Sequence, residues 1–509
     1  MSTPNSNPNS HPYPQPQTQT SNFIPTTKST STSTSNTPSI SHSPSLSTSS
    51  NHKTIEISPN PSNPDAYTYA YAYPDLTTSI EEKETVIEET LAHRTRTNGT
   101  QVTTASWRAL GPPPDGGLRA WTQVILSHLV IMNTWGFINS FGVFQTYYVS
   151  TLQRPASSIS WIGSIQIFLL FFIGTFTGRL TDAGYFRSVF LVGTIIGLVG
   201  IFMTSISTTY WQVFLAQGIC MGLGNGCLFC PALATLSTYF STKKSLVIGI
   251  AAAGSATGGV IFPIMVQQLL PRIGYGWTMR SLGLIQLVCL GVCNLGIRQR
   301  VPPRKSGALI DYASFKDIPY MLFAAGMFFN FWGLYFAFYY LGAYARNIIG
   351  LPLPESITII IILNAVGIIG RILPNHLADR LFGPLNTLLP ITLINSLLCF
   401  SWIAVSSRTG LYVWAIMYGI FAAGIQGLFP ATLSSLTTDM RKAGVRMGMV
   451  FTVVSFAVLT GPPIGGVLVQ RMGGKYEYAQ VFAAADLCVG AGFLFLARRA
   501  RSRVWGVKM

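Results

Sequence analysis

The amino-acid sequence predicts an all-α membrane protein with twelve transmembrane helices in two six-helix repeats and with both termini in the cytosol. Only 10% of its 509 residues are charged, against about 25% in a typical soluble domain, while 49% are hydrophobic. From residue 121 onward, apolar runs of roughly 20 residues recur with short breaks, which is the length that crosses a bilayer as a helix. Lipid offers no hydrogen bonds to the backbone, so helices are the expected form.

The start of the chain is polar. Residues 1–110 are rich in Ser, Thr, Pro and Asn, and they predict a disordered cytosolic tail because they cannot bury enough apolar surface to offset the entropy of ordering. The tail has no early apolar core, so we expect no cleavable signal peptide. The other predicted parts are a first six-helix half (111–297), a central cytoplasmic loop (298–317), a second six-helix half (318–498) and a basic cytosolic tail (499–509).

The longest connection between apolar runs, residues 298–317, divides the predicted spans six and six. The spans are expected at 121–147, 160–180, 187–206, 211–236, 245–270, 277–297, 318–345, 355–376, 385–405, 411–436, 444–470 and 478–498. If the N-terminus is cytosolic, most Lys and Arg of the loops and of the C-terminal tail also fall on the cytosolic side. This asymmetry predicts the orientation.

The two halves resemble each other at an offset of about 190 to 201 residues. Gly178-Arg-Leu-Thr-Asp182 closes the second span, and Gly370-Arg371 with Ala378-Asp379-Arg380 closes the eighth. Pro231-Ala232 in the fourth span is echoed by Pro430-Ala431 in the tenth. Equivalent residues are six helices apart, so the repeats run parallel, as in a carrier whose halves rock around a site near the midplane.

Several classes of function are excluded by what the sequence lacks. The net charge is +16, but the basic residues are scattered over short loops, so we expect no nucleic-acid partner. The cysteines lie in apolar segments and the histidines form no cluster, so no metal and no cofactor are expected; Cys227-Leu-Phe-Cys230 lacks the context of a redox motif. No nucleophile and base pair or phosphate-binding loop is recognisable, so we expect no enzyme.

Arg371 is the principal candidate site residue. It falls about 15 residues into an apolar run that begins near Ile357, and a charge at such a depth is costly and usually faces a bundle interior or a water-filled path. The alternative is that Arg371 lies near the cytosolic end of its helix and extends its guanidinium to the lipid headgroups. Asp379 and Arg380 come later and mark the membrane exit, which favours a site role for Arg371.

Two motifs resemble a known family. Gly178-x-Leu-x-Asp182-x-Gly184 after the second span, together with the six-plus-six layout, resembles the major facilitator superfamily. Pro114-Asp-Gly-Gly-x-x-Ala-Trp121 before the first span and Asn139-Ser-Phe-Gly-Val-Phe144 within it resemble the monocarboxylate porter family, especially its fungal members. The likeness covers about residues 112 to 500.

The resemblance implies roles for individual residues. Asp182 and Arg187 would form part of a cytoplasmic gating network, with Asp379 and Arg380 as its weaker counterpart; an acid and a base there can form an ion pair that breaks as the halves rock. The alternative is that these are ordinary cytosolic charges. Arg371 would bind the substrate carboxylate through its planar fork.

Two departures from the family concern proton coupling. Proton-coupled animal members have a lysine where this chain has Asn139, and an aspartate where it has Gly367. Asp486 in the twelfth span is the remaining candidate proton carrier, if burial favours its neutral form, although it could equally pair with a neighbouring helix. The candidate substrate-binding residues are Arg371, Asn139, Asn364, Asn133, Asn330, Tyr335 and Gln426, and further candidates for the cavity are Trp135, Gln145, Asn225 and Phe331.

The sequence thus predicts a secondary transporter that moves an organic solute, a monocarboxylate or a larger acidic metabolite, by alternating access. The alternatives are an efflux carrier for a secondary metabolite and a nutrient sensor of the same fold that does not transport. The expected partners are a small, anionic organic substrate and the lipid bilayer, and a monomer is plausible. The expected location is the plasma membrane, with the vacuolar membrane as the alternative.

Overall fold

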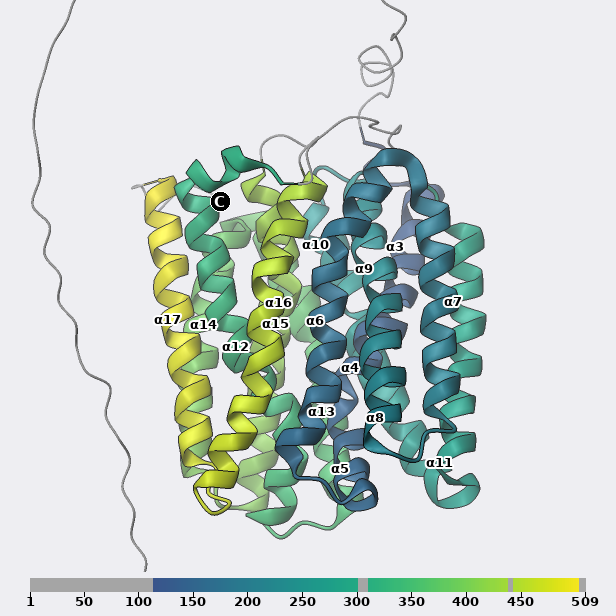
Figure 1. The fold of residues 1–509 in the computed structure, drawn as a ribbon. Coiled ribbons are helices and arrows are strands. Elements are labelled where there is room, and N and C mark those ends of the chain that lie inside the picture. The colour runs from purple at the N-terminus through teal and green to yellow at the C-terminus, as the bar shows by residue number, and fades with distance from the viewer. Residues whose placement is uncertain (1–112, 301–309, 438–442, 503–509) are drawn as a thin grey trace, which may run out of the picture. The chain divides into compact units, whose positions relative to one another are not determined.

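The computed structural model describes residues 113–300, 310–437 and 443–502, and all regular structure in these residues is helical (Figure 1). The predicted tail 1–110 and parts of the predicted central loop and of the C-terminal tail lie outside the described residues. The longer helices are α3 (Gly117–Ile131), α5 (Phe141–Leu152), α6 (Ala156–Leu180), α7 (Phe186–Thr204), α9 (Met221–Ser237), α10 (Lys244–Ala252), α11 (Gly254–Gly296), α12 (Ile318–Asn347), α13 (Leu353–Leu377), α14 (Pro384–Ser401), α15 (Arg408–Leu436), α16 (Ala443–Arg471) and α17 (Glu477–Arg501).

Short helical pieces join the longer ones. They include π-helical turns, which widen the helix and rotate the faces on either side of them. The π-helical turns are η1 (Met132–Gly136), η2 (Thr181–Tyr185), η3 (Phe214–Cys220) and η5 (Ala378–Phe382); the other pieces are α4 (Phe137–Asn139), α8 (Tyr210–Val213), η4 (Tyr312–Lys316) and η6 (Trp402–Ala404).

Among the described residues, ten helical runs are long and apolar enough to cross a membrane. Two of them, Ala156–Thr204 and Lys244–Gly296, contain 49 and 53 residues, whereas about 20 residues suffice for one crossing. Each contains a glycine with a positive φ, 98° at Gly184 and 72° at Gly274, a conformation that a residue with a Cβ rarely adopts. The chain turns at these glycines, and Figure 1 shows α6 and α7, which flank Gly184, as separate rods.

Local sequence explains where several helices begin. Thr209 and Gln212 form a capping box at the start of α8, and the Ser407 side chain accepts a hydrogen bond from the Gly410 amide at the start of α15. Asp317 does the same for α12 by accepting from the Tyr320 amide. These side chains satisfy amides that have no partner inside the helix.

The bundle exposes many large apolar side chains on its outer helices. Leu191 and Ile195 of α7 and Val288 and Leu295 of α11 are all at least half exposed. A surface of this kind would promote association in water, whereas in a bilayer lipid tails cover it. The outside of the bundle is therefore suited to lipid.

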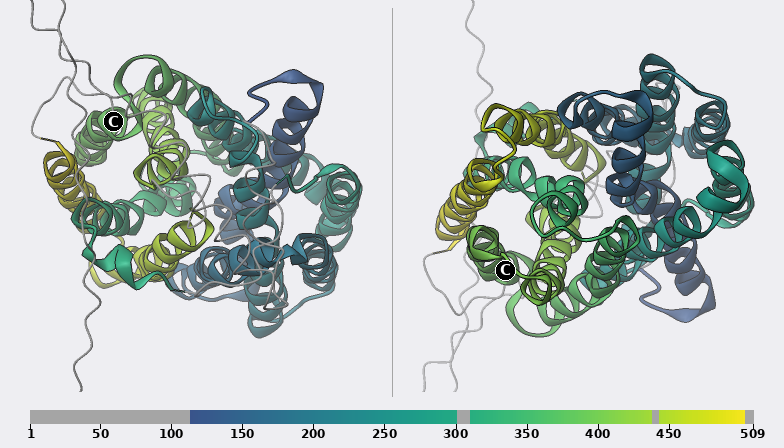
Figure 2. Two further views of the ribbon diagram at one scale, coloured as in Figure 1. Left: turned by 90° about the horizontal axis from the view of Figure 1, so that it is seen from above. Right: turned by 90° about the horizontal axis from the view of Figure 1, so that it is seen from below.

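The helices form two groups, α3–α11 and α12–α17, which we call the first and the second helix group. Seen along the bundle, the colours of the first group gather on one side and those of the second on the other (Figure 2). The groups contact each other along α6 and α16, along α11 and α13, and between α5 and α12. The candidate site lies in the interface between them.

Candidate functional site

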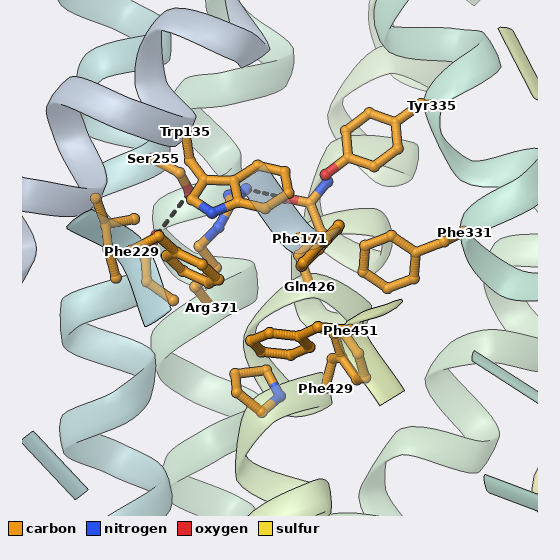
Figure 3. Close-up of a pocket in the computed structure, with 13 residues that line it drawn as sticks. Trp135, Phe171, Phe229, Ser255, Phe331, Tyr335, Arg371, Gln426, Phe429 and Phe451 are labelled. Atoms are coloured by element: carbon orange, nitrogen blue, oxygen red, sulfur yellow. Dashed lines mark hydrogen bonds between the residues drawn. The ribbon is translucent and has the colours of Figure 1, made fainter. Parts of the chain in front are cut away.

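A cavity of about 40 Å³ lies between the two helix groups (Figure 3). Its polar side chains are Ser255, Tyr335, Arg371 and Gln426. The rest of its lining is apolar and consists of Ile131, Trp135, Phe171, Phe229, Ala252, Phe331, Phe429, Pro430 and Phe451. We call this space the central cavity.

Arg371 provides the one formal charge among the residues that line the central cavity. It extends from α13, is only 1% exposed, and its Nη1 donates to the Gly367 carbonyl at 3.2 Å while its Nη2 donates to Gln426 Oε1. A guanidinium has five N–H donors in a planar fork. Two described contacts therefore orient the group and leave further donors for a ligand.

No acidic residue lines the central cavity, and no ion pair of Arg371 occurs within the described residues. A buried cation without a counter-ion is unfavourable by several kcal/mol, because it has lost its hydration and gained no opposite charge. A bound anion would remove that penalty. The central cavity therefore has the electrostatics of an anion site.

The walls of the central cavity are aromatic and come from both helix groups. Trp135 of the first group stacks on Tyr335 of the second with ring centroids 6.2 Å apart, and Phe171 of the first lies 5.1 Å from Phe451 of the second. Rings at these distances bury large apolar areas and can stack on a planar ligand. The cavity thus combines one cationic fork with an apolar, aromatic surround.

Gly367 explains how Arg371 fits. A Cβ built on Gly367 would lie 2.7 Å from Arg371 Nη1, which means that the guanidinium folds back over this glycine into the space that a side chain would need. In the monocarboxylate porter family that the sequence resembles, proton-coupled animal members have an aspartate at this position. Here the Arg371 guanidinium occupies the space that such a side chain would need. Its charge is left available instead of being paired within the helix.

The structure brings together only part of the predicted substrate-binding set. Arg371, Gln426 and Tyr335 line the central cavity, and so do Trp135 and Phe331. Asn133 bonds back to the Leu129 carbonyl, Asn330 to Gly326 and Asn364 to Ile360, each in its own helix, and none of the three lines the cavity. Asn139 is buried, and neither of its amide atoms has a hydrogen-bond partner among the described residues.

Asp486 also lies away from the central cavity. It is 7% exposed on α17, in a part of the second helix group where α14 packs on α17: Ser396 donates to the Ala484 carbonyl at 2.9 Å. One of its carboxylate oxygens is buried without a hydrogen-bond partner in the described part of the chain. A proton on that oxygen would have no direct route to Arg371 in this conformation.

The predicted gating aspartates lie at one end of the bundle, where helices of opposite groups meet. Asp379 accepts hydrogen bonds from the amides of Ser245 and Leu246, at 3.1 and 2.7 Å, in the first turn of α10. Asp182 lies beside the start of α16, where a Cβ built on Gly444 would be 2.7 Å from its Oδ2. A carboxylate at a helix N-terminus is stabilised by the helix dipole and by unpaired amides. We call this the capped end.

The predicted basic partners of these aspartates are placed differently. Arg187 and Arg380 are both exposed, and within the described residues neither side chain makes a hydrogen bond or an ion pair. The described contacts of Asp379 run to backbone amides of α10 in the other helix group. The sequence carries no information on which helix ends approach each other, so the contacts of Asp379 with the start of α10 could not be predicted from it.

Two further contacts at the capped end were not predicted from the sequence. Asp115 accepts hydrogen bonds from the amide and hydroxyl of Ser241 and from the amide of Thr242, and these bonds hold the pKa of its carboxyl below the ordinary value. Asp317 forms an ion pair with Arg446 at 2.6 Å. Both aspartates lie just before the first long helix of their group. For Asp115, the Pro114-Asp115-Gly116 motif could have indicated a structural role.

Four phenylalanines of the cavity wall were also not predicted from the sequence: Phe171, Phe229, Phe429 and Phe451. A signal did exist for two of them. Phe229 lies two residues before Pro231 of the fourth predicted span, and Phe429 lies one residue before Pro430 of the tenth. Each half therefore contributes a ring next to the repeated Pro-Ala pair, from adjacent rather than equivalent positions of the repeat.

Apolar helices in two groups that enclose a charged cavity define a membrane transporter. Residues 125–444 match the sequence model described as Major Facilitator Superfamily, and the chain belongs to this superfamily. It is 50% identical over 391 residues to an MFS-type transporter of Gibberella zeae, and the aligned residues cover 76% of this chain and 88% of that protein. It is 36% identical over 390 residues to the aspyridones efflux protein apdF of Emericella nidulans, covering 76% of this chain and 79% of that one.

A solved structure supports the fold. The crystal structure of the human organic anion transporter MFSD10 (TETRAN) superimposes with a TM-score of 0.60 over 74% of this chain and 99% of that chain, at 12% sequence identity. This likeness concerns the fold alone. The chain is thus a multi-pass membrane transporter with the fold of this superfamily.

Proposed function

We propose that this transporter moves an organic anion with an aromatic or otherwise bulky apolar body, by alternating access of the central cavity. The observation that carries the proposal is Arg371, which is buried in a cavity with no acidic residue among its lining side chains. An anionic ligand compensates the charge, and the guanidinium fork can bind a carboxylate or an enolate with two hydrogen bonds. The phenylalanine and tryptophan rings favour the apolar remainder of such a ligand.

The proposed topology has twelve crossings with both termini in the cytosol. The 49- and 53-residue runs each count as two crossings that meet at Gly184 and Gly274, which brings the ten observed runs to the expected number. Residues 111–297 and 318–498 then form the halves that rock, 298–317 connects them, and 1–110 and 499–509 are cytosolic tails. The capped end of the bundle is on the cytosolic side in this arrangement.

Export of a secondary metabolite is the direction we favour. The relative in Emericella nidulans is named an aspyridones efflux protein, and the aromatic lining of the central cavity favours a ligand with an apolar, aromatic body over a simple short-chain acid. The second candidate is transport of a small monocarboxylate. It is favoured by the first-span motif from Pro114 to Trp121, which resembles the monocarboxylate porter family. The plasma membrane is the proposed location, with the vacuolar membrane as the alternative.

The test is transport by purified protein in proteoliposomes, with labelled 2-naphthoate as the bulky aromatic anion and labelled lactate as the small one. We expect saturable flux of 2-naphthoate and little flux of lactate. Each flux is measured with and without a pH gradient, because gradient-driven flux would support a proton carrier such as Asp486. Lactate flux that exceeds naphthoate flux would contradict the proposed substrate class and favour the second candidate.

Substitution of Arg371 tests the site itself. Arg371→Ala should abolish 2-naphthoate flux, since the anion loses its only cation in the cavity. Arg371→Lys should leave about a tenth of the flux or less, because an ammonium keeps the charge but not the two-pronged hydrogen bonds. Membrane insertion and size-exclusion behaviour are compared with wild type to confirm folding. Wild-type flux in Arg371→Ala would refute the assignment.

A further inference from the structure

A second cavity, of about 210 Å³, lies between the two helix groups at the end of the bundle opposite the capped end. It is lined by residues of α5 and α6 from the first group and of α12 and α16 from the second, with Tyr476 at its rim. Ser157 of α6 donates to Gln470 Oε1 of α16 at 3.0 Å, which ties the groups together beside it. We call this space the outer cavity.

Arg346 provides the one formal charge among the residues lining the outer cavity, which include no acid. It comes from the last turn of α12. Its Nε is buried and has no hydrogen-bond partner in the described part of the chain. A partly buried guanidinium beside a polar space and without an acid repeats, on a wider scale, the electrostatics found around Arg371.

Unpaired amide and hydroxyl groups accompany Arg346. Gln145 is 3% exposed, and neither its Nε2 nor its Oε1 has a hydrogen-bond partner among the described residues. Tyr340 is 1% exposed; its hydroxyl lies near the side chains of Gln145 and Ser160 but makes no hydrogen bond of regular geometry among the described residues. Both side chains line the outer cavity. Buried polar groups are normally satisfied, so three unsatisfied ones around one space indicate that a ligand or water completes them.

An arginine at the end of a helix can be explained without a ligand. That explanation does not cover the polar side chains that surround Arg346. A cation in the last turn of a helix is stabilised by the helix dipole, and an arginine near a membrane surface can extend toward lipid headgroups. Neither effect requires a buried amide and a buried phenol with open hydrogen-bonding capacity facing the same cavity. Together, Arg346, Gln145 and Tyr340 provide the charge and the hydrogen-bonding groups that would bind a polar molecule.

One helix connects the outer cavity to the central one. Tyr335 lines the central cavity and Tyr339 the outer cavity, and residues four apart on a helix share a face and are about 6 Å apart along its axis. The hydroxyl of Tyr335 is buried without a partner among the described residues, and that of Tyr339 lies near the Ser164 side chain. The ring of Tyr339 lies 4.9 Å from that of Phe141 in the other group.

We infer that the outer cavity is a second binding station for the same organic anion, in which Arg346 binds the acidic group and Gln145 and Tyr340 bind it or a neighbouring oxygen. This inference rests on the proposed function, because it takes its ligand class from the central cavity. The anion passes from Arg371 to Arg346 when Tyr339 withdraws from Phe141. The positive charge of Arg346 lowers the electrostatic cost for the anion of leaving Arg371.

The experiment measures equilibrium binding of 2-naphthoate to the purified full-length protein, with Arg371→Ala used to silence the central cavity. We expect weaker but saturable binding in Arg371→Ala. Addition of Arg346→Gln should raise the Kd of this residual binding by about tenfold or more, which corresponds to about 1.4 kcal/mol. The matched control is Arg154→Gln, since Arg154 is exposed and does not line the outer cavity. This control should leave the Kd unchanged.

The outcomes separate the two assignments. Absence of saturable binding in Arg371→Ala, or equal effects of Arg346→Gln and Arg154→Gln, would overturn the outer station. If Arg371→Ala binds as tightly as wild type, the central assignment fails, and the Arg346→Gln and Arg154→Gln variants in the wild-type background decide on the outer station alone. The neutral analogue 2-naphthamide should bind no variant at the outer station. If Arg371→Ala does not fold, Arg371→Gln replaces it.

Discussion

At the scale of single residues, the relation between Arg371 and Gly367 decides the chemistry of the central cavity. The guanidinium occupies the space above Gly367 and donates to its carbonyl. An acid at that position would neutralise the arginine from one helical turn away. The glycine therefore keeps a free positive charge in the cavity and gives the arginine its orientation.

Introducing the acid tests this relation. Gly367→Asp should lower the affinity for 2-naphthoate at least about tenfold, because an internal carboxylate would compete with the ligand for Arg371. Gly367→Ala is the matched control: it crowds Nη1 without adding charge, so it should cost less. Binding to the purified variants is the measurement. Equal losses in the two variants would mean that space, rather than charge, is what Gly367 provides.

The sequence indicated the charged residue of the cavity and part of its polar lining, but not Ser255 and not the phenylalanine rings. Arg371 stands out in an apolar run, and Tyr335 and Gln426 line the cavity with it, whereas the predicted asparagines do not. Asn133 was expected in the cavity but lies in the π-helical turn η1, which rotates its helix face away from the position that a regular helix would give it. An extra residue in a turn cannot be seen in a pattern of apolar residues.

At the scale of helices, the capped end is built from contacts between one group's loop and the other group's helix start. Asp379 of the second group holds the first turn of α10 in the first, and Asp182 of the first lies at the start of α16 in the second. The Asp379 contact satisfies two backbone amides at the start of α10 that would otherwise lack partners. Opening this end therefore requires both helix starts to lose these neighbours.

Loss of one carboxylate should be measurable locally. In Asp379→Ala, amide hydrogen exchange across residues 245–252 should be about fivefold faster, because a helix cap contributes about 1 kcal/mol. Exchange measured by mass spectrometry on the purified protein provides the readout. Arg380→Ala is the control, as Arg380 is exposed; it should leave the exchange rate as in wild type. Unchanged exchange in Asp379→Ala would show that the cap does not hold α10.

The helices themselves were largely predictable, whereas their joints were not. Apolar runs placed the spans from 318 onward close to the observed α12, α13, α14, α15, α16 and α17, because lipid imposes both length and composition. At Gly184 and Gly274 the sequence predicted short loops, and the structure has turns inside almost continuous helical runs. Only the backbone angle at each glycine reveals the turn, and many other glycines in this chain lie in straight helix.

At the scale of the whole molecule, the two helix groups are held mainly by α6 against α16 and α11 against α13. Thr175 of α6 donates to the Gly448 carbonyl of α16 at 2.7 Å, close to the capped end, and Ser157 meets Gln470 toward the other end. Long antiparallel contacts of this kind permit small sliding and tilting. They are compatible with rigid groups that rock about a site between them.

The polar N-terminal tail should be dispensable for transport. Its composition offers little apolar surface to pack against the helices, so deletion of residues 1–100 should leave the turnover of 2-naphthoate in proteoliposomes within about twofold of wild type. Flux per inserted protein is the measurement, with surface abundance in cells followed separately. A large loss of flux in the reconstituted truncation would mean that the tail takes part in the transport cycle.

The scarcity of hydrogen-bonding groups in the central cavity limits how finely the carrier can discriminate between related compounds. Beside Arg371, the hydrogen-bonding side chains among its lining residues are Ser255, Tyr335, Gln426 and the indole N–H of Trp135, and a largely apolar pocket rejects an analogue with one extra hydroxyl group only weakly. A carrier with such a cavity recognises its ligand by one acidic group and by a flat apolar body. Under the proposed export of a secondary metabolite, compounds of one biosynthetic series that share the acidic group would leave through the same carrier.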